Sequence, residues 1–152
     1  MSQPPLPQTD RSLPIALMRA RERVMAPIRD MLAETGITEQ QWRVLRVLSE
    51  AETLDATELA DRASLHQPSL TRILKTLNTR GFIARTQDAN DKRRQAVTLT
   101  PKGHRVIAEN AAEAAQIADA LRDTLGAERF DMLLDLLSAL DAFRYNGGSS
   151  PR

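Results

Sequence analysis

Residues 68–80, with the sequence PSLTRILKTLNTR, decide the fold class of this chain. Their apolar side chains recur at three- and four-residue steps, which predicts an amphipathic helix that ends before Gly81. These apolar side chains are Leu70, Ile73, Leu74 and Leu77. Pro68 is compatible with the first helical turn, where a missing backbone N–H breaks no helical bond. The opposite face carries Arg72, Lys75 and several hydroxyl side chains, with almost nothing acidic, so it forms a basic, polar surface.

Two short strands and a turn follow this helix. Residues 82–86 and 95–99 are rich in β-forming side chains that alternate with polar ones, and residues 87–91 supply turn-forming Asp and Asn. This pattern predicts a β-hairpin. Its basic tip contains Lys92, Arg93 and Arg94.

Two helix-capping signals lie upstream. Thr38 and Gln41 have capping-box spacing, in which each side chain can bond a free backbone N–H, so a helix is predicted to begin there. Asp55 and Glu58 repeat this spacing and predict a short helix that ends near Ser64.

A long helix precedes these elements. Residues 15–34 show helical apolar periodicity, and Gly36 can end this helix in a left-handed conformation. Pro27 lies inside the pattern and lacks a backbone N–H, so we expect a kink or break near Met25 and Ala26.

Two further helices are predicted at the C-terminal end. Thr100 and Pro101 have the residue types of an N-cap and first position, and Gly126 can end the helix that they begin. The apolar residues of the last helix, from Phe130 to Phe143, occupy more of its circumference than one stripe requires. We therefore expect a partner to cover part of that helix.

The order of these elements predicts a mainly α fold with a small β-hairpin wing, a winged helix-turn-helix. In such a unit the helix that begins at Pro68 enters the major groove of DNA and the hairpin tip can reach the minor groove. The distribution of charge is consistent with DNA binding. Residues 62–105 carry 10 Lys and Arg against 2 Asp and Glu, a net charge of +8 within a chain of net charge +1. A solvated helix face is the alternative explanation of such a charge block.

Composition and motifs exclude several other classes of protein. The 152 residues are long enough for one well-buried domain, and the absence of Cys excludes disulfides and thiolate metal sites. His66 and His104 lack ligand spacing with a carboxylate, so we expect no metal and no cofactor. No nucleophile elbow or phosphate loop is present, which argues against an enzyme. No apolar run reaches the ~18 residues of a membrane span, so we expect a cytoplasmic protein.

The sequence resembles the MarR family of regulators over nearly the whole ordered chain. The stretch DKRRQAVTLTPKG, residues 91–103, is similar to the family signature D-x-R…L-T-x-x-G. Residues 20–22, 38–46 and 68–74 resemble, more narrowly, the subgroup that regulates homoprotocatechuate and hydroxycinnamate degradation. That resemblance implies a homodimeric repressor of an aromatic-compound catabolic operon, released by a small aromatic carboxylic acid.

The resemblance also implies roles for individual residues. Arg93 would be the wing arginine in the minor groove, with Arg94 as its substitute, and Asp91 would orient the basic groups of the wing. The helix residues implied to meet bases or phosphates are Gln67, Ser69, Thr71 and Arg72. We add Lys75 and Lys92 to these DNA contacts because they belong to the same basic segment. His66 and Gln67 depart from the link typical of the subgroup, which leaves the operator sequence open.

A domain organisation follows from the patterns and the resemblance together. Residues 38–100 would form the DNA-binding lobe, and residues 12–36 and 101–144 would form dimerisation helices. The proline-rich residues 1–11 are expected to be a disordered arm and residues 145–152 a flexible tail. A two-fold dimer implies a pseudo-palindromic double-stranded operator with half-sites ~10 bp apart.

A carboxylate ligand needs a bidentate cation beside an apolar surface. We hypothesise that Arg21 and Arg43 hold the acid while Trp42 covers its aromatic ring. The alternatives are that these arginines pair with Glu22, Glu39 or Asp30 and that Trp42 is a core anchor.

A different class of function also fits the fold. A winged helix can serve as a protein–protein adaptor or antagonist that does not bind DNA, since fold alone does not fix function. Salt-dependent binding to duplex DNA distinguishes the two.

Overall fold

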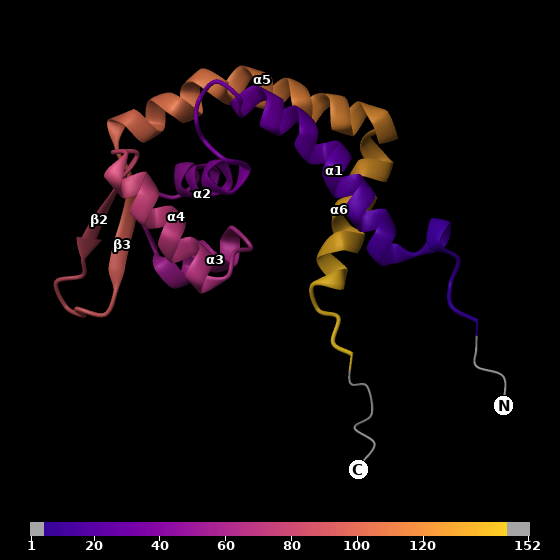
Figure 1. Cartoon of the computed structure of the whole chain (residues 1–152), viewed down its shortest axis with the longest axis horizontal. Coiled ribbons are helices and arrows are strands. Elements are labelled where there is room, and N and C mark those ends of the chain that lie inside the picture. Colours follow the sequence, from indigo (N-terminus) through magenta and orange to yellow (C-terminus); the bar gives the residue numbers. More distant parts are fainter. Residues whose placement is uncertain (1–4, 146–152) are drawn as a thin grey trace, which may run out of the picture. The chain divides into compact units, whose positions relative to one another are not determined.

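A computed structural model describes residues 5–145 of the chain (Figure 1). Residues 1–4 of the expected arm and residues 146–152 of the expected tail lie outside the described residues. Within the arm, Thr9–Arg11 form a short 3-10 helix, η1, that buries no side chain. The chain divides into two units between Ala114 and Ala115, and the helix α5, Pro101–Leu125, crosses that division.

The first unit begins with α1, Leu13–Leu32, which was expected to kink or break near Met25 and Ala26. The predicted break is wrong, because the helix continues through Pro27, and the kink stays a prediction. A proline removes the bond to the carbonyl four residues earlier, here Arg23. Because Arg23 is exposed, water can take that bond. Gly36 follows with φ 68°, the left-handed conformation expected of it.

Two capping boxes set the next helices, α2 (Glu39–Ser49) and α3 (Ala56–Arg62). Thr38 Oγ1 accepts from the Gln41 N–H, and the Gln41 side chain accepts from the Thr38 N–H, at 3.1 Å each. Asp55 and Glu58 bond in the same way at the start of α3. Both predicted helix starts are confirmed.

The basic helix is α4, Gln67–Thr79. It begins at Gln67, so Pro68 occupies its second position, still within the turn that needs no N–H. All four predicted apolar side chains are buried: Leu70, Ile73, Leu74 and Leu77. The opposite face is exposed, as predicted.

Three antiparallel strands form the wing and its base, in the order β1-β3-β2. The hairpin strands are β2, Ile83–Gln87, and β3, Gln95–Leu99. The sequence analysis missed β1, Leu54–Asp55, which pairs with Val97 and Ala96 of β3. A strand of two residues is too short to show an alternating pattern.

The wing is tied to the start of α5 by a close backbone approach. The Thr100 hydroxyl donates to the Gly81 carbonyl at 2.6 Å and accepts from the Gly103 N–H at 3.2 Å, which confirms Thr100 as the N-cap. A Cβ on Gly103 would lie 2.2 Å from the Phe82 carbonyl oxygen. The glycine of the signature therefore lets α5 pack directly on the backbone at the base of the wing.

The buried apolar side chains of the described residues all lie between Met31 and Val97. The core is thus built by the end of α1, by α2 to α4 and by the sheet. The last helix, α6, Ala127–Leu140, buries no side chain within the described chain. An ion pair between Arg122 and Asp131 joins α5 to α6 inside the second unit.

Candidate nucleic-acid interface

The exposed face of α4 brings together the side chains predicted to contact DNA. Arg72 and Lys75 are exposed, and no ion pair in residues 5–145 neutralises either cation. Gln67 and Thr71 are exposed near the N-terminus of the helix, whereas Ser69 is half-buried. The Thr71 hydroxyl donates to the Gln67 carbonyl at 2.9 Å, so its lone pairs still face outward.

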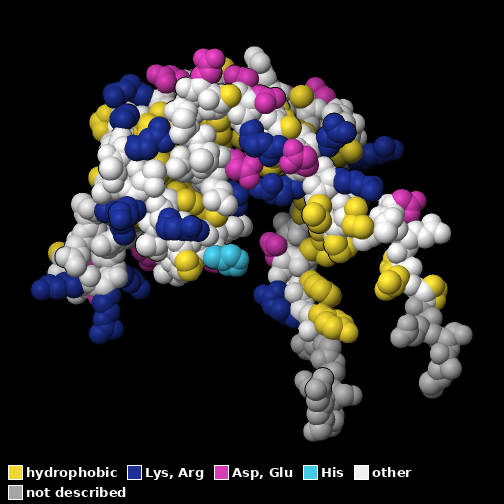
Figure 2. Space-filling model, in the orientation of Figure 1, with side chains coloured by type: hydrophobic (Ala, Val, Ile, Leu, Met, Phe, Trp, Pro, Cys, Tyr) yellow, Lys and Arg dark blue, Asp and Glu magenta, His cyan; other side chains and the backbone are white. Residues whose placement is uncertain are grey.

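The tip of the wing presents a second set of cations. Lys92, Arg93 and Arg94 are all exposed, and Figure 2 shows Lys and Arg side chains gathered at the tip of the β2–β3 hairpin. The Asp91 carboxylate accepts from the Arg93 N–H at 3.0 Å, and the Asp91 carbonyl accepts from the Arg94 N–H. Asp91 therefore fixes the backbone of the tip from which the two arginines project.

A hollow of about 250 Å³ lies between the start of α2 and the face of α4. Its lining includes Ser69 and Arg72 together with Thr38 and Gln40. The sequence analysis missed Gln40 as a candidate contact, because it is uncharged and carries only a helix-start signal. Its proximity to α4 depends on tertiary packing.

The residues predicted to hold a ligand have other partners. Arg21 forms an ion pair with Glu39, which also binds Arg29 at 3.3 Å, and Arg29 pairs in addition with Glu22. The hydrogen bond from Arg21, helped by Arg29, holds the pKa of the Glu39 carboxyl below its ordinary value, although burial opposes this shift. The hydrogen bond that Arg29 donates to Glu39 in turn raises the pKa of Arg29.

Arg43 and Trp42 are also engaged. Arg43 Nη1 donates to the Ala63 carbonyl at 3.0 Å and to the Ser64 carbonyl at 3.3 Å. Trp42 is only 6% exposed and belongs to the core. Arg21 thus has the expected carboxylate partner and Trp42 is a core residue, whereas Arg43 bonds backbone carbonyls and not one of the expected carboxylates. The ligand-binding role of the three residues stays a prediction.

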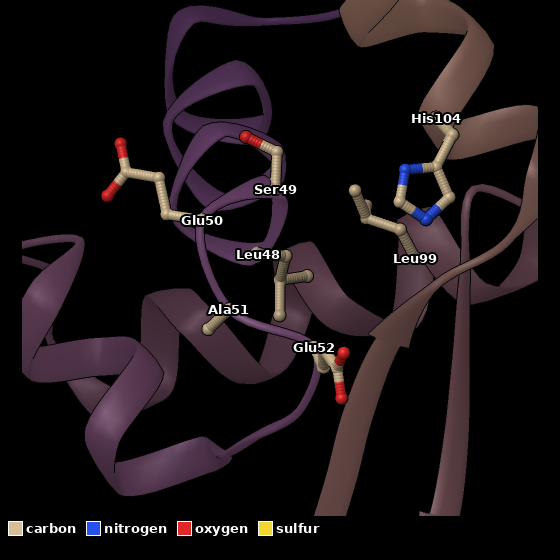
Figure 3. A pocket seen from close by; sticks show the side chains of 7 residues that line it. All are labelled: Leu48, Ser49, Glu50, Ala51, Glu52, Leu99 and His104. Carbon is tan, nitrogen blue, oxygen red and sulfur yellow. The ribbon is translucent and has the colours of Figure 1, made fainter.

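Two hollows outside the α4 surface have contrasting linings. One, of about 390 Å³, is walled by Leu32, Ala33, Gly36 and Ile37 and bordered by Arg29 and Glu39. The other, of about 400 Å³, lies between the end of α2 and His104 (Figure 3). His104 extends toward Leu99, and the Glu50 carboxylate points away from it. With Glu50 and Glu52 and no Lys or Arg in its lining, this second hollow does not favour an anion.

No helix within residues 5–145 combines the length and apolar character needed to cross a bilayer. Across the same described residues, no three His, Asp or Glu side chains gather closely enough to hold a metal ion.

These elements define a winged helix-turn-helix protein: a short helix, a turn, a helix with a basic outer face and a basic hairpin. The family model described as "MarR family" matches residues 37–94. The chain is 40% identical to the HTH-type transcriptional regulator FarR of Neisseria gonorrhoeae, over 85% of this chain and 88% of that protein. It is 38% identical to the homoprotocatechuate degradative operon repressor of Escherichia coli, over 83% and 85%. The chain therefore belongs to the MarR family, as the signature in residues 91–103 indicated.

Solved structures of similar proteins have the same fold. NadR in complex with 4-hydroxyphenylacetate is 38% identical, with a TM-score of 0.79 over 92% of this chain and 99% of that one. The transcriptional repressor CouR bound to a 23-mer DNA duplex is 28% identical, with a TM-score of 0.79 over the same shares. The predicted fold class is thereby confirmed.

Proposed function

We propose that this protein is a homodimeric, sequence-specific DNA-binding repressor of an aromatic-compound catabolic operon, released by a small aromatic carboxylic acid. The observation that carries this proposal is the pair of exposed cation sets on α4 and the wing. They lie on one lobe whose fold is shared with a repressor bound to a DNA duplex. This activity would place the protein on the nucleoid, in the cytoplasm.

Each element has a distinct role in the proposed complex. α4 enters the major groove, where Gln67, Ser69, Thr71 and Arg72 meet base edges or adjacent phosphates. Arg93 enters the minor groove from the wing, with Arg94 beside it. Lys75 and Lys92 neutralise phosphates and add sequence-independent affinity.

The homodimer is supported by the apolar surface of α6. Five of its large apolar side chains are 40–60% exposed in the single chain, and apolar side chains gathered in this way mark an interaction surface. They are Met132, Leu133, Leu134, Leu136 and Leu140. A two-fold pair of subunits would cover this surface and read a pseudo-palindromic operator with half-sites ~10 bp apart.

Ligand release is supported by the relatives. One is a repressor of homoprotocatechuate degradation, and another was solved with 4-hydroxyphenylacetate. If Arg21, Trp42 and Arg43 form the site, an acid must displace Glu39 from Arg21 and the turn carbonyls from Arg43. For release, the ligand must bind the DNA-incompetent conformation more tightly than the DNA-bound one.

The ligand site is tested with the fluorescence of Trp42, the only tryptophan. The wild-type protein, Arg21→Ala and Arg43→Ala are titrated with 4-hydroxyphenylacetate. A loss of affinity in both variants supports the three-residue site, and unchanged affinity in either removes that arginine from it.

The experiment that tests the function is a fluorescence-anisotropy titration against the promoter DNA that flanks the gene of this protein. It is run at about 50 and about 200 mM salt, with and without hydroxylated phenylacetates and cinnamates. Tight, salt-sensitive binding that one acid reverses supports a ligand-released repressor. Absence of duplex binding at both salt concentrations favours the adaptor.

A further inference from the structure

The turn between α3 and α4 sets where the recognition helix begins. α3 ends in a Schellman motif, in which the Leu65 N–H bonds the Ala60 carbonyl at 2.9 Å and the Ser64 N–H bonds the Asp61 carbonyl at 3.1 Å. Ser64 has φ 50°, a left-handed conformation that normally selects glycine. The turn is thus tight and locally strained.

The turn is held from outside by one side chain. Arg43, on α2, directs Nη1 at the carbonyls of Ala63 and Ser64, where α3 presents its unpaired, partially negative end. Among the described residues, Arg43 makes the only side-chain hydrogen bonds to residues 63–66. A cation with several donors in one plane is well suited to bind two adjacent carbonyls.

α2 is a firm anchor for this contact. Val44 and Leu45, the two residues that follow Arg43 in α2, are fully buried. α2 therefore cannot shift without disturbing the core. At the other end, the N-cap of α4, His66, makes no side-chain capping bond. The start of α4 therefore depends on the turn, and the turn depends on Arg43.

We propose that Arg43 is a positioning residue for DNA recognition, which holds the α3–α4 turn so that Gln67, Ser69 and Arg72 meet the bases in register. This inference rests on the proposed function. It gives Arg43 a task that occupies its guanidinium, and so differs from the ligand-binding role predicted from the sequence. Misplacing the N-terminal end of α4 would weaken base contacts while leaving the contacts of Lys75 and the wing with phosphates.

The test compares Arg43→Met with Arg43→Lys and with Arg46→Met. Arg46 lies on the same helix, and among residues 5–145 its guanidinium bonds only Ser49 and Glu50, at the end of α2. The Arg46 variant therefore removes the same charge without touching the turn. Each protein is titrated with the duplex that wild-type protein protects from nuclease at its own promoter and with a scrambled duplex of the same composition. The readout is the ratio of the two affinities.

We expect Arg43→Met to lower this ratio roughly tenfold, the size of one good base contact, with little change on the scrambled duplex. Arg43→Lys should recover part of the ratio, because an ammonium can still bond one carbonyl, and Arg46→Met should keep it. An unchanged ratio in Arg43→Met overturns the inference alone. If wild-type protein binds neither duplex, the proposed function falls and the inference falls with it.

Loss of stability must be separated from loss of positioning. Ser64→Gly relieves the left-handed strain and should raise Tm. It is therefore combined with Arg43→Met. If the double variant regains both Tm and the affinity ratio, Arg43 acts only through stability and the proposal is wrong. If Tm returns while the ratio stays low, the positioning role is supported.

Discussion

Glu39 links α1 to α2 through its bonds with Arg21 and Arg29. Its pKa is lowered in the folded protein, chiefly by the hydrogen bond from Arg21. A carboxyl with a depressed folded pKa stabilises the protein above its unfolded pKa, about 4.3 for glutamate, and this contribution is lost as the pH falls through the folded pKa.

We therefore expect Glu39→Gln to lower the free energy of unfolding at pH 7 by about 0.5–1 kcal/mol, the range of partly exposed ion pairs. The difference from wild type should disappear at acid pH, below the folded pKa. Urea unfolding at several pH values measures both effects, and Glu34→Gln, which alters a carboxyl with no ion pair among residues 5–145, serves as the control. A difference that persists unchanged into acid would contradict this account.

At the scale of elements, the wing and α4 should differ in what they contribute to binding. Arg93→Ala combined with Arg94→Ala should weaken binding to every duplex and flatten the salt dependence of affinity, because the lost contacts are chiefly electrostatic. Ser69→Ala or Arg72→Ala should act mainly on the choice between sequences. Anisotropy titrations with operator and scrambled duplexes at two salt concentrations separate these effects. Unchanged affinity in the wing variant would rule out the docking described here.

The tight packing where β3 meets α5 predicts that Gly103 cannot be replaced without loss of stability. A methyl group on Gly103 would meet the Phe82 carbonyl, a backbone atom that cannot move aside. Gly103→Ala should lower stability by about 2 kcal/mol, as overpacking commonly does. Gly126→Ala separates a steric clash from backbone strain, because its Cβ would meet nothing within 4 Å while its φ of 81° and ψ of 153° favour glycine. Thermal melting should show Gly103→Ala with a lower Tm than wild type, and an unchanged Tm would contradict the predicted clash.

Much of this fold was predictable because its elements carry local signals. The two capping boxes, the stripe on α4 and the hairpin all depend on residues within a few positions of one another. β1 has too few residues to carry such a signal. Pro27 does not break α1, since it removes a single bond, the one to the carbonyl of the exposed Arg23.

The candidate site was predictable to the same local extent. Exposure of the cations on α4 and the wing followed from helical and hairpin geometry. The partners of Arg21 and Arg43 did not, because Glu39 lies 18 residues from Arg21 and Ala63 lies 20 residues from Arg43. Only the packed structure decides which of several acidic or carbonyl groups an arginine reaches.

At the scale of the whole molecule, the apolar face of α6 should determine the number of subunits. Met132 and Leu136 are both 60% exposed and lie one helical turn apart. Replacing both with Glu should give a monomer in light scattering and abolish tight operator binding, since one half-site remains. Asp135→Asn, on the same helix, should stay dimeric. A dimer that survives the double substitution would show that the subunits associate elsewhere.

The buried apolar core extends only from Met31 to Val97, so α6 lies outside it. In the proposed dimer, the lifetime of the protein would therefore depend on its concentration. A helix that buries nothing on its own is readily opened and cleaved, whereas the same helix in a pair is protected. Newly made subunits that remain monomeric would be degraded first by cellular proteases, and dimeric ones would persist. The protein would then persist only where its concentration is high enough for subunits to pair. Operator occupancy would fall steeply when synthesis drops below that concentration.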